Sequence, residues 1–274
     1  MNLKKLLIRS LSGLVYVGLI AGCLLWGLLP FACLGAAMAV IATVEFAHIC
    51  HNDKSRLLPT LILDVLGCVF LAFGVYVFPL ALWLATWICR MVMEIYTHSD
   101  RPLHDMSHSM MSQLYIGLPI GVMVALGPWF GSLHTVLAIF LMIWINDTGA
   151  FLVGSLTGRH KMIERISPKK TWEGFAGGLA FNLVAGALMC IYGSDFFDIH
   201  FNLWLWLGLG ALVTVFATWG DLVESMIKRN LHIKDSGKLI PGHGGILDRI
   251  DSLLLVMPAS LVYFLMIDLC RYAV

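Results

Sequence analysis

The stretch NLWLWLGLGALVTVFATWGDLVESM, residues 202–226, decides the fold class of this chain. It exceeds the roughly 20 mostly apolar residues that a helix needs to cross a bilayer. The chain then turns polar, and residues 225–251 read SMIKRNLHIKDSGKLIPGHGGILDRID. Charge this dense beside lipid needs a partner, and phosphate together with a divalent cation is the expected one.

The composition of the whole chain agrees with a membrane protein. Of the 274 residues, 59% are hydrophobic and only 13% are charged, whereas soluble domains are about half apolar and a quarter charged. The sequence therefore predicts an all-α, polytopic integral membrane protein. The seven cysteines are isolated and form no CxxC pair, so neither a disulfide framework nor a zinc site is indicated.

Apolar runs of bilayer length recur along the chain, and we expect about nine transmembrane helices. The predicted spans are 11–29, 31–50, 57–75, 77–97, 110–130, 133–156, 173–193, 202–226 and 252–271. The first two meet at Pro30, which predicts a tight hairpin there, and Pro79 helps to separate the third from the fourth. Leu24-Leu25-Trp26 offers no small-residue cleavage site, so we expect an uncleaved first span rather than a signal peptide.

The basic residues predict the orientation. With the N-terminus in the cytoplasm, the further cytoplasmic segments are 51–56, 98–109, 157–172 and 227–251. Of 18 Lys and Arg residues, only Arg271 then falls on the far side, as the positive-inside rule requires. We expect residues 1–130 to be a scaffold of five spans and a candidate dimer interface, with an apolar, unremarkable N-terminal third. We expect residues 131–274 to carry the chemistry on the cytoplasmic side.

Two polar groups precede the quoted span. Asn146 and Asp147 lie inside an apolar run, where an acid usually faces a bundle interior or a water-filled cavity. A structural hydrogen bond between helices is the alternative. Lys169 and Lys170, in ISPKKTWEG at a helix entry, are typical of an anion site. Ordinary flanking charge is the alternative, although Glu173 argues against it.

The quoted span ends in carboxylates. On a helix, Asp221, Glu224, Ser225 and Lys228 fall on one face. Mg²⁺ usually takes one or two carboxylates plus phosphates and water, so this face is a candidate metal site. A local Glu224–Lys228 ion pair is compatible with that role, but it does not account for Asp221.

A glycine-rich turn follows. In PGHGGILDRID, the glycines beside His243 let the backbone approach phosphate oxygens closely. Asp248 and Asp251 are three residues apart and face one way on a helix entering the last span. Acids near a helix N-terminus are also favourable for their own sake. Neither GxxxxGK[ST] nor GxGxxG occurs, so nucleotide binding through those loops is not indicated.

The run from Ser225 to Asp251 resembles the pattern of the phosphatidate cytidylyltransferase family of bacteria. The resemblance rests on the spacing of Ser225, Lys228-Arg229, Lys234-Asp235, Gly237, Pro241, His243-Gly244-Gly245, Asp248-Arg249 and Asp251. With Asn146-Asp147, Ser167–Gly174 and Trp219-Gly220-Asp221, it covers roughly residues 144–251. It implies an enzyme of the bacterial inner membrane, its site facing the cytoplasm, that makes CDP-diacylglycerol and pyrophosphate from CTP and phosphatidate.

The resemblance and the residue patterns together predict the site. The expected catalytic residues are Asp221, Asp248, Lys228, Arg229, Arg249 and His243. The expected substrate-binding residues are Asp147, Ser167, Lys169, Lys170, Thr171, Glu173, Ser225, Lys234, Asp235, Gly244 and Gly245. The expected metal ligands are Asp221 and Asp248, supported by Glu224 and Asp251. Mg²⁺ is the expected cofactor, with Mn²⁺ as an alternative and a second, monovalent cation beside it. A homodimer surrounded by membrane lipids is expected, and no nucleic-acid partner.

A membrane transporter with an intramembrane charged site is the alternative function. A transporter needs polar residues along a path to both faces of the membrane. Here they gather towards the predicted cytoplasmic face. A transferase consuming a CDP-activated lipid would show the pattern DGxxAR…GxxxD…D, which does not occur.

Overall fold

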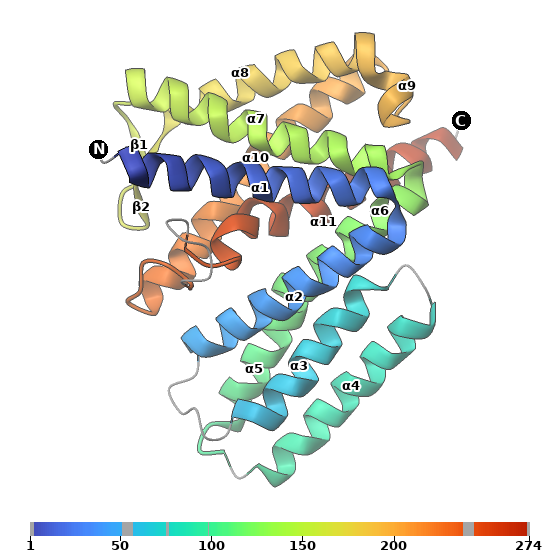
Figure 1. The fold of residues 1–274 in the computed structure, drawn as a ribbon, viewed down its shortest axis with the longest axis vertical. Coiled ribbons are helices and arrows are strands. Elements are labelled where there is room, and N and C mark those ends of the chain that lie inside the picture. The colour runs from blue at the N-terminus through green and yellow to red at the C-terminus, as the bar shows by residue number, and fades with distance from the viewer. Residues whose placement is uncertain (1–2, 51–56, 75–76, 98, 238–243, 273–274) are drawn as a thin grey trace. The chain divides into compact units, whose positions relative to one another are not determined.

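The structure is a computed structural model that describes residues 3–50, 57–74, 77–97, 99–237 and 244–272 (Figure 1). The described chain is almost entirely helical, with one two-stranded sheet. It divides into two compact units. The first comprises Met1–Ala125 and Ile233–Ile250, and the second Leu126–His232 and Asp251–Val274.

The predicted fold class is confirmed, because most of the helices are long and apolar. Among the described residues, seven are long and apolar enough to cross a membrane: Leu28–Cys50, Phe78–Tyr96, Pro102–Phe130, Leu133–Thr157, Trp172–Phe197, Leu203–Asn230 and Leu247–Arg271. Two shorter apolar helices, Gly13–Trp26 and Pro59–Ala72, match the remaining predicted spans. The protein is therefore an integral membrane protein, while the number of crossings and the cytoplasmic N-terminus stay predictions.

The first unit begins with α1 (Leu3–Trp26) and α2 (Leu28–Cys50). The predicted break at Pro30 is wrong, because the helices separate at Gly27, whose φ of 141° favours glycine. Pro30 lies in the first turn of α2, where a missing N–H costs no hydrogen bond. α3 (Leu57–Ala72) packs between α2 and α4 (Val77–Tyr96) (Figure 1).

The first unit continues through α5 (Pro102–Ser112), the π-helical turn η1 (Gln113–Gly117) and the start of α6 (Leu118–Phe130). The predicted span 110–130 therefore begins earlier than expected. Pro102 stands at the start of α5, a position that suits proline because the first N–H groups of a helix have no intrahelical partner. The polar residues after it, which indicated a loop over 98–109, continue the helix.

A buried ionic cluster corrects the prediction of an unremarkable N-terminal third. The Arg90 side chain is only 3% exposed, and its Nη1 lies 2.6 Å from Glu94 Oε2. Its Nε lies 3.8 Å from Asp64 Oδ1, and Asp64 also accepts a hydrogen bond from Ser109. Arg90 and Glu94 lie one turn apart in α4, whereas Asp64 lies in α3 and Ser109 in α5. The Arg90–Glu94 pair is therefore local to α4, and Asp64 and Ser109 join it because α3, α4 and α5 pack together.

The second unit contains α7 (Leu133–Thr157), α8 (Trp172–Leu188), η2 (Met189–Gly193), α9 (Ser194–Phe197), α10 (Leu203–Asn230) and most of α11 (Leu247–Tyr272). α8 packs against both α7 and α10. The predicted loop 157–172 contains a β-hairpin of β1 (Lys161–Ile163) and β2 (Ser167–Thr171). The strands are antiparallel, with Lys161 opposite Thr171 and Ile163 opposite Ser167.

Glycine brings α7 and α8 close together beside this hairpin. A Cβ on Gly174 would lie 3.0 Å from Ala150 O of α7, and a Cβ on Gly154 would lie 3.2 Å from Gly174 Cα. Side chains at these positions would force the helices apart. The hairpin between the two helices is consequently held against the end of α7.

Candidate functional site

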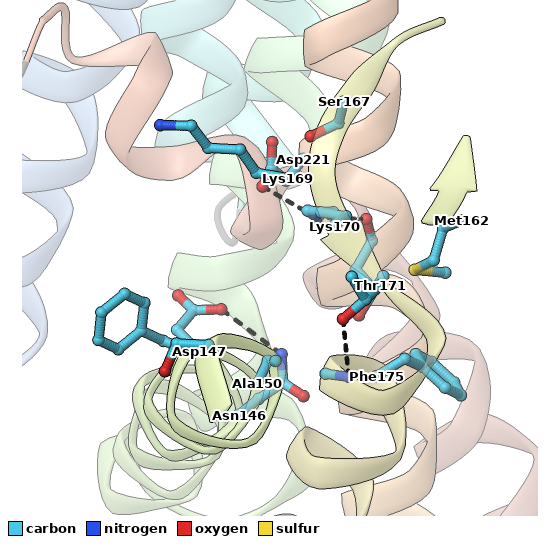
Figure 2. A pocket seen from close by; sticks show the side chains of 15 residues that line it. Asn146, Asp147, Ala150, Met162, Ser167, Lys169, Lys170, Thr171, Phe175 and Asp221 are labelled. Atoms are coloured by element: carbon cyan, nitrogen blue, oxygen red, sulfur yellow. Dashed lines mark hydrogen bonds and ion pairs between the residues drawn. The ribbon is translucent and has the colours of Figure 1, made fainter. Parts of the chain in front are cut away.

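A cavity of about 590 Å³ opens in the second unit between α7, the β-hairpin, α8 and α10 (Figure 2). Its volume suits a small-molecule ligand. The predicted site residues that line it are Asp147, Ser167, Lys169, Lys170, Thr171 and Asp221. These predicted residues come from three separate elements, α7, β2 and α10, and meet at one cavity, as the charged patterns indicated.

The base of the hairpin is tied by Thr171 and Glu173. Thr171 Oγ1 caps α8 by accepting the N–H of Gly174 at 3.1 Å. The Glu173 carboxylate lies 2.6 Å from His160 Nδ1 and accepts the N–H of Arg159 at 3.1 Å. Glu173 therefore closes the hairpin, and its predicted contact with substrate stays a prediction.

The two lysines of the hairpin differ in their surroundings. Lys170 Nζ lies 2.9 Å from Asp221 Oδ2 and donates to the carbonyl oxygen of Thr218 at 3.0 Å. Figure 2 shows Lys170 and Asp221 facing each other across the cavity wall. Lys169 is exposed and has no hydrogen-bond or ion-pair partner within the described part of the chain. Lys169 is the lysine whose charge remains available to an anionic ligand.

Three carboxylates meet beside the cavity. One oxygen from each of Asp221, Glu224 and Asp251 lies within 4.8 Å of the others, and we call this group the acidic cluster. Gly220 permits it, because a Cβ there would lie 2.5 Å from Asp251 O and 3.0 Å from Ser252 Cα. The close approach of α10 and α11 thus brings Asp251 to the two acids of α10.

Two cations lie against the acidic cluster. Besides the Lys170–Asp221 pair, Lys228 Nζ lies 2.5 Å from Glu224 Oε2, and the Glu224 side chain is only 1% exposed. The ion pair that the spacing suggested is therefore present, together with the cluster. Grouped carboxylate oxygens are ligands that hard divalent cations prefer, so the residues present fit such an ion.

Two other predicted residues support this wall. Ser225 Oγ donates to Asp221 Oδ1 at 3.2 Å. Arg229 Nε donates to the carbonyl oxygen of Ile166 at 3.3 Å, which joins the end of α10 to the hairpin turn. The first bond orients Asp221 within α10, and the second joins α10 to the hairpin. A direct contact with substrate stays a prediction for both residues.

The remaining predicted residues lie in the first unit, around the start of α11. Asp248 Oδ2 accepts the N–H of Ser236 at 3.0 Å and the N–H of Gly245 at 2.8 Å. Gly244 has a φ of 82°, which favours glycine. Three further predicted site residues have exposed side chains: Lys234, Asp235 and Arg249. His243 lies outside the described residues. The predicted metal-binding role of Asp248 stays a prediction.

Sequence reasoning left several cavity residues out of its site. Asn146 is 2% exposed, lines the cavity and donates through Nδ2 to Asp147 Oδ1 at 3.4 Å (Figure 2). Thr218, which holds Lys170 through its carbonyl oxygen, also lines the cavity. Thr218 could have been predicted from its spacing. It precedes the predicted ligand Asp221 by three positions, so both side chains lie on the same face of α10.

A family model described as "Cytidylyltransferase family" matches residues 7–267. The chain belongs to the cytidylyltransferase family. This membership confirms the predicted resemblance and extends it over the N-terminal helices, which the sequence patterns did not cover.

Curated relatives of the family agree. The chain is 44% identical over 154 residues to the phosphatidate cytidylyltransferase of Staphylococcus haemolyticus (strain JCSC1435). It is 45% identical over 154 residues to that of Staphylococcus aureus (strain COL). Each match covers 56% of this chain and 57% of the relative. The chain therefore matches somewhat over half the length of these relatives.

Proposed function

We propose that this chain transfers the cytidylyl group of CTP to phosphatidate, producing CDP-diacylglycerol and pyrophosphate for phospholipid synthesis. The observation that carries the proposal is the position of Asp221. It lines the cavity and belongs to the acidic cluster, so a cation held by the cluster would face a ligand in the cavity. The names of the staphylococcal relatives support the choice of substrates.

The proposed reaction is a displacement at phosphorus. A phosphate oxygen of phosphatidate forms a bond to the α-phosphorus of CTP, and the bond from that phosphorus to the bridging oxygen of pyrophosphate breaks. The attacking oxygen is already anionic near neutral pH, so no strong general base is required. Reactions of this type depend mainly on positioning and charge neutralisation, which is what a cavity bordered by lysines and carboxylates offers.

The side chains divide this work. Lys169 binds the incoming anion, because its charge is exposed at the cavity and unpartnered within the described residues. Lys170 holds Asp221 in place through its ion pair. Asp221, Glu224 and Asp251 would hold Mg²⁺, or alternatively Mn²⁺. When bound, such an ion would neutralise phosphate charge as the pyrophosphate leaves.

The setting of the reaction is also part of the proposal. The bacterial inner membrane is carried over from the family resemblance, and the distribution of basic residues favours a site that faces the cytoplasm. Phosphatidate then enters laterally, with its acyl chains remaining in the bilayer. A homodimer and a second, monovalent cation are carried over from the family resemblance, and both are proposals here.

The proposal is tested with the purified full-length protein in phosphatidate-containing vesicles. Labelled CTP and Mg²⁺ are added, and labelled CDP-lipid and pyrophosphate are measured. We expect both products in equal amounts, and loss of both when a chelator removes the divalent cation. Well-folded protein that forms no CDP-lipid contradicts the proposal. Ion uptake into vesicles without CTP consumption would instead support the transporter alternative.

A further inference from the structure

The start of α11 is held by an acid that comes from the far end of the sequence. Glu45 lies near the C-terminal end of α2, about 200 residues away from its partners, and it belongs to the same unit as they do. In the sequence it is a single acid in an apolar run, and no pattern marked it. Its contacts nevertheless reach the polar run that carries the family resemblance.

Both oxygens of Glu45 are used. Oε1 accepts the N–H of Ile246 at 3.1 Å, and Oε2 accepts the N–H of Leu247 at 3.0 Å. Ser236 Oγ lies 3.3 Å from Oε2, on the other side of the loop. The first N–H groups of a helix have no intrahelical acceptor, and a negative charge there is favourable. Glu45 therefore caps α11 from a different helix.

Two glycines of the loop make room for this carboxylate. A Cβ on Gly237 would lie 2.5 Å from Glu45 Oε1. A Cβ on Gly245 would collide with Glu45 Oε2 and with Ser236 Oγ. At both positions the absence of a side chain lets an internal carboxylate approach the backbone. For Gly245, the sequence predicted a close approach by substrate phosphate instead.

Asp248 completes the arrangement from the first turn of α11. Its Oδ2 lies 3.0 Å from Ser236 Oγ and accepts the N–H of Gly245 at 2.8 Å. Glu45 and Asp248, which we call the loop carboxylates, thus share Ser236 and both accept N–H groups just before or at the start of α11. Two acids from different helices therefore hold Ser236 beside the start of α11.

We propose that Glu45 is a positioning residue for cytidylyl transfer, acting through Ser236, residues 245–247 and the start of α11. The proposal rests on the proposed function, because Gly245 and Asp248 are predicted site residues. Glu45 does not itself touch the reacting atoms. It sets the first turn of α11, which carries Asp248 and leads one turn later to Asp251.

The contact between residue 45 and the N–H groups of Ile246 and Leu247 requires two acceptor oxygens at the reach of a glutamate side chain. Glutamine has the same length, but it would offer one acceptor and would turn an NH₂ group towards a backbone N–H. Aspartate keeps both acceptors but is one methylene shorter. Glu45→Gln should therefore release one of the two α11 amides, whereas Glu45→Asp should retain part of the cap.

The test combines hydrogen exchange with steady-state kinetics on the full-length protein. In Glu45→Gln, we expect exchange of one of the Ile246 and Leu247 amides to become about tenfold faster or more, and kcat to fall by a similar factor. We expect the KM for CTP to change by less than about threefold, because the substituted group binds no substrate. Glu45→Asp should recover part of both losses.

Glu94→Gln is the matched control, since it removes a buried carboxylate of the same unit that pairs with Arg90 rather than with the loop. It should lower thermal stability, leave exchange at Ile246 and Leu247 unchanged and leave kcat per folded molecule unchanged. Unchanged amide exchange in Glu45→Gln would overturn the proposal. So would tighter CTP binding in that variant, because the carboxylate would then be blocking an anion site. Wild-type protein that makes no CDP-lipid refutes the proposed function, while the exchange result still decides whether Glu45 holds the loop.

Discussion

The acidic cluster and the loop carboxylates are both groups of acids at helix ends, but they are neutralised in different ways. Glu45 and Asp248 accept hydrogen bonds from backbone N–H groups and from a serine. Asp221, Glu224 and Asp251 face one another, with lysines as their charged partners. Carboxylates satisfied by fixed donors organise the backbone. Carboxylates that face each other repel and favour a bound cation.

The largest loss of activity is expected from replacing Asp221, which belongs to the acidic cluster and also lines the cavity. Asp221→Asn should lower CTP-dependent turnover by about 100-fold or more, because charge stabilisation at the reacting phosphates is lost. Membrane insertion should be intact. Asp195→Asn is the control, since the Asp195 side chain is fully exposed on α9. CDP-lipid formation is the measurement, and near-normal turnover in Asp221→Asn would refute the metal assignment.

The next largest effect is expected from replacing Lys228, which tests whether the acidic cluster binds a cation. Lys228→Met leaves the buried Glu224 without its lysine, and breaking a buried pair in this way costs about 3 kcal/mol of stability. Thermal unfolding in detergent should therefore occur at a lower temperature. Added Mg²⁺ should stabilise this variant more than the wild type, because the cluster carries one more unbalanced negative charge. Equal stabilisation of both proteins would contradict a cation at the cluster.

The close approach of α10 and α11 can be tested through Gly220. In Gly220→Ala, the added Cβ meets backbone atoms of Asp251 and Ser252, and overpacking of this kind costs about 1–3 kcal/mol. We expect a lower unfolding temperature together with weaker Mg²⁺ stabilisation. Gly18→Ala is the control, because nothing lies within 4 Å of a Cβ at Gly18. Unchanged Mg²⁺ stabilisation in Gly220→Ala would show that the cluster does not depend on this contact.

The smallest effect concerns the unpaired lysine of the hairpin. Lys169→Ala should raise the KM for CTP about threefold to tenfold with little change in kcat, since an exposed charge contributes modestly to binding. Lys161→Ala is the control, because Lys161 is exposed on the same hairpin but does not line the cavity. Equal effects of both substitutions would indicate general attraction of anions rather than a contact at Lys169.

The sequence predicted correctly those features of the site that depend on spacing within a single helix, and it was less successful for helix ends and for the short β-hairpin. The i, i+3 spacing of Asp221 and Glu224 placed them on one helix face, and the structure keeps them together. The break between the first two helices was predicted at Pro30, but Pro30 lies in the first turn of α2. Proline occurs both where a helix ends and in the first turn of a helix, and the sequence does not distinguish these two positions. The β-hairpin over 161–171 was expected to be a loop, since its strands are short and carry no alternation of apolar and polar residues.

The sequence by itself determined the membrane class, the family and the residues of the cavity wall that lie in charged patterns. These depend on hydropathy and on spacing within single elements, which are local properties of the chain. Only the tertiary structure decided that Asp251 joins Asp221 across Gly220 and that Glu45 caps α11. Such contacts join segments that are far apart in sequence, and their existence depends on how closely helices pack, which no local spacing encodes.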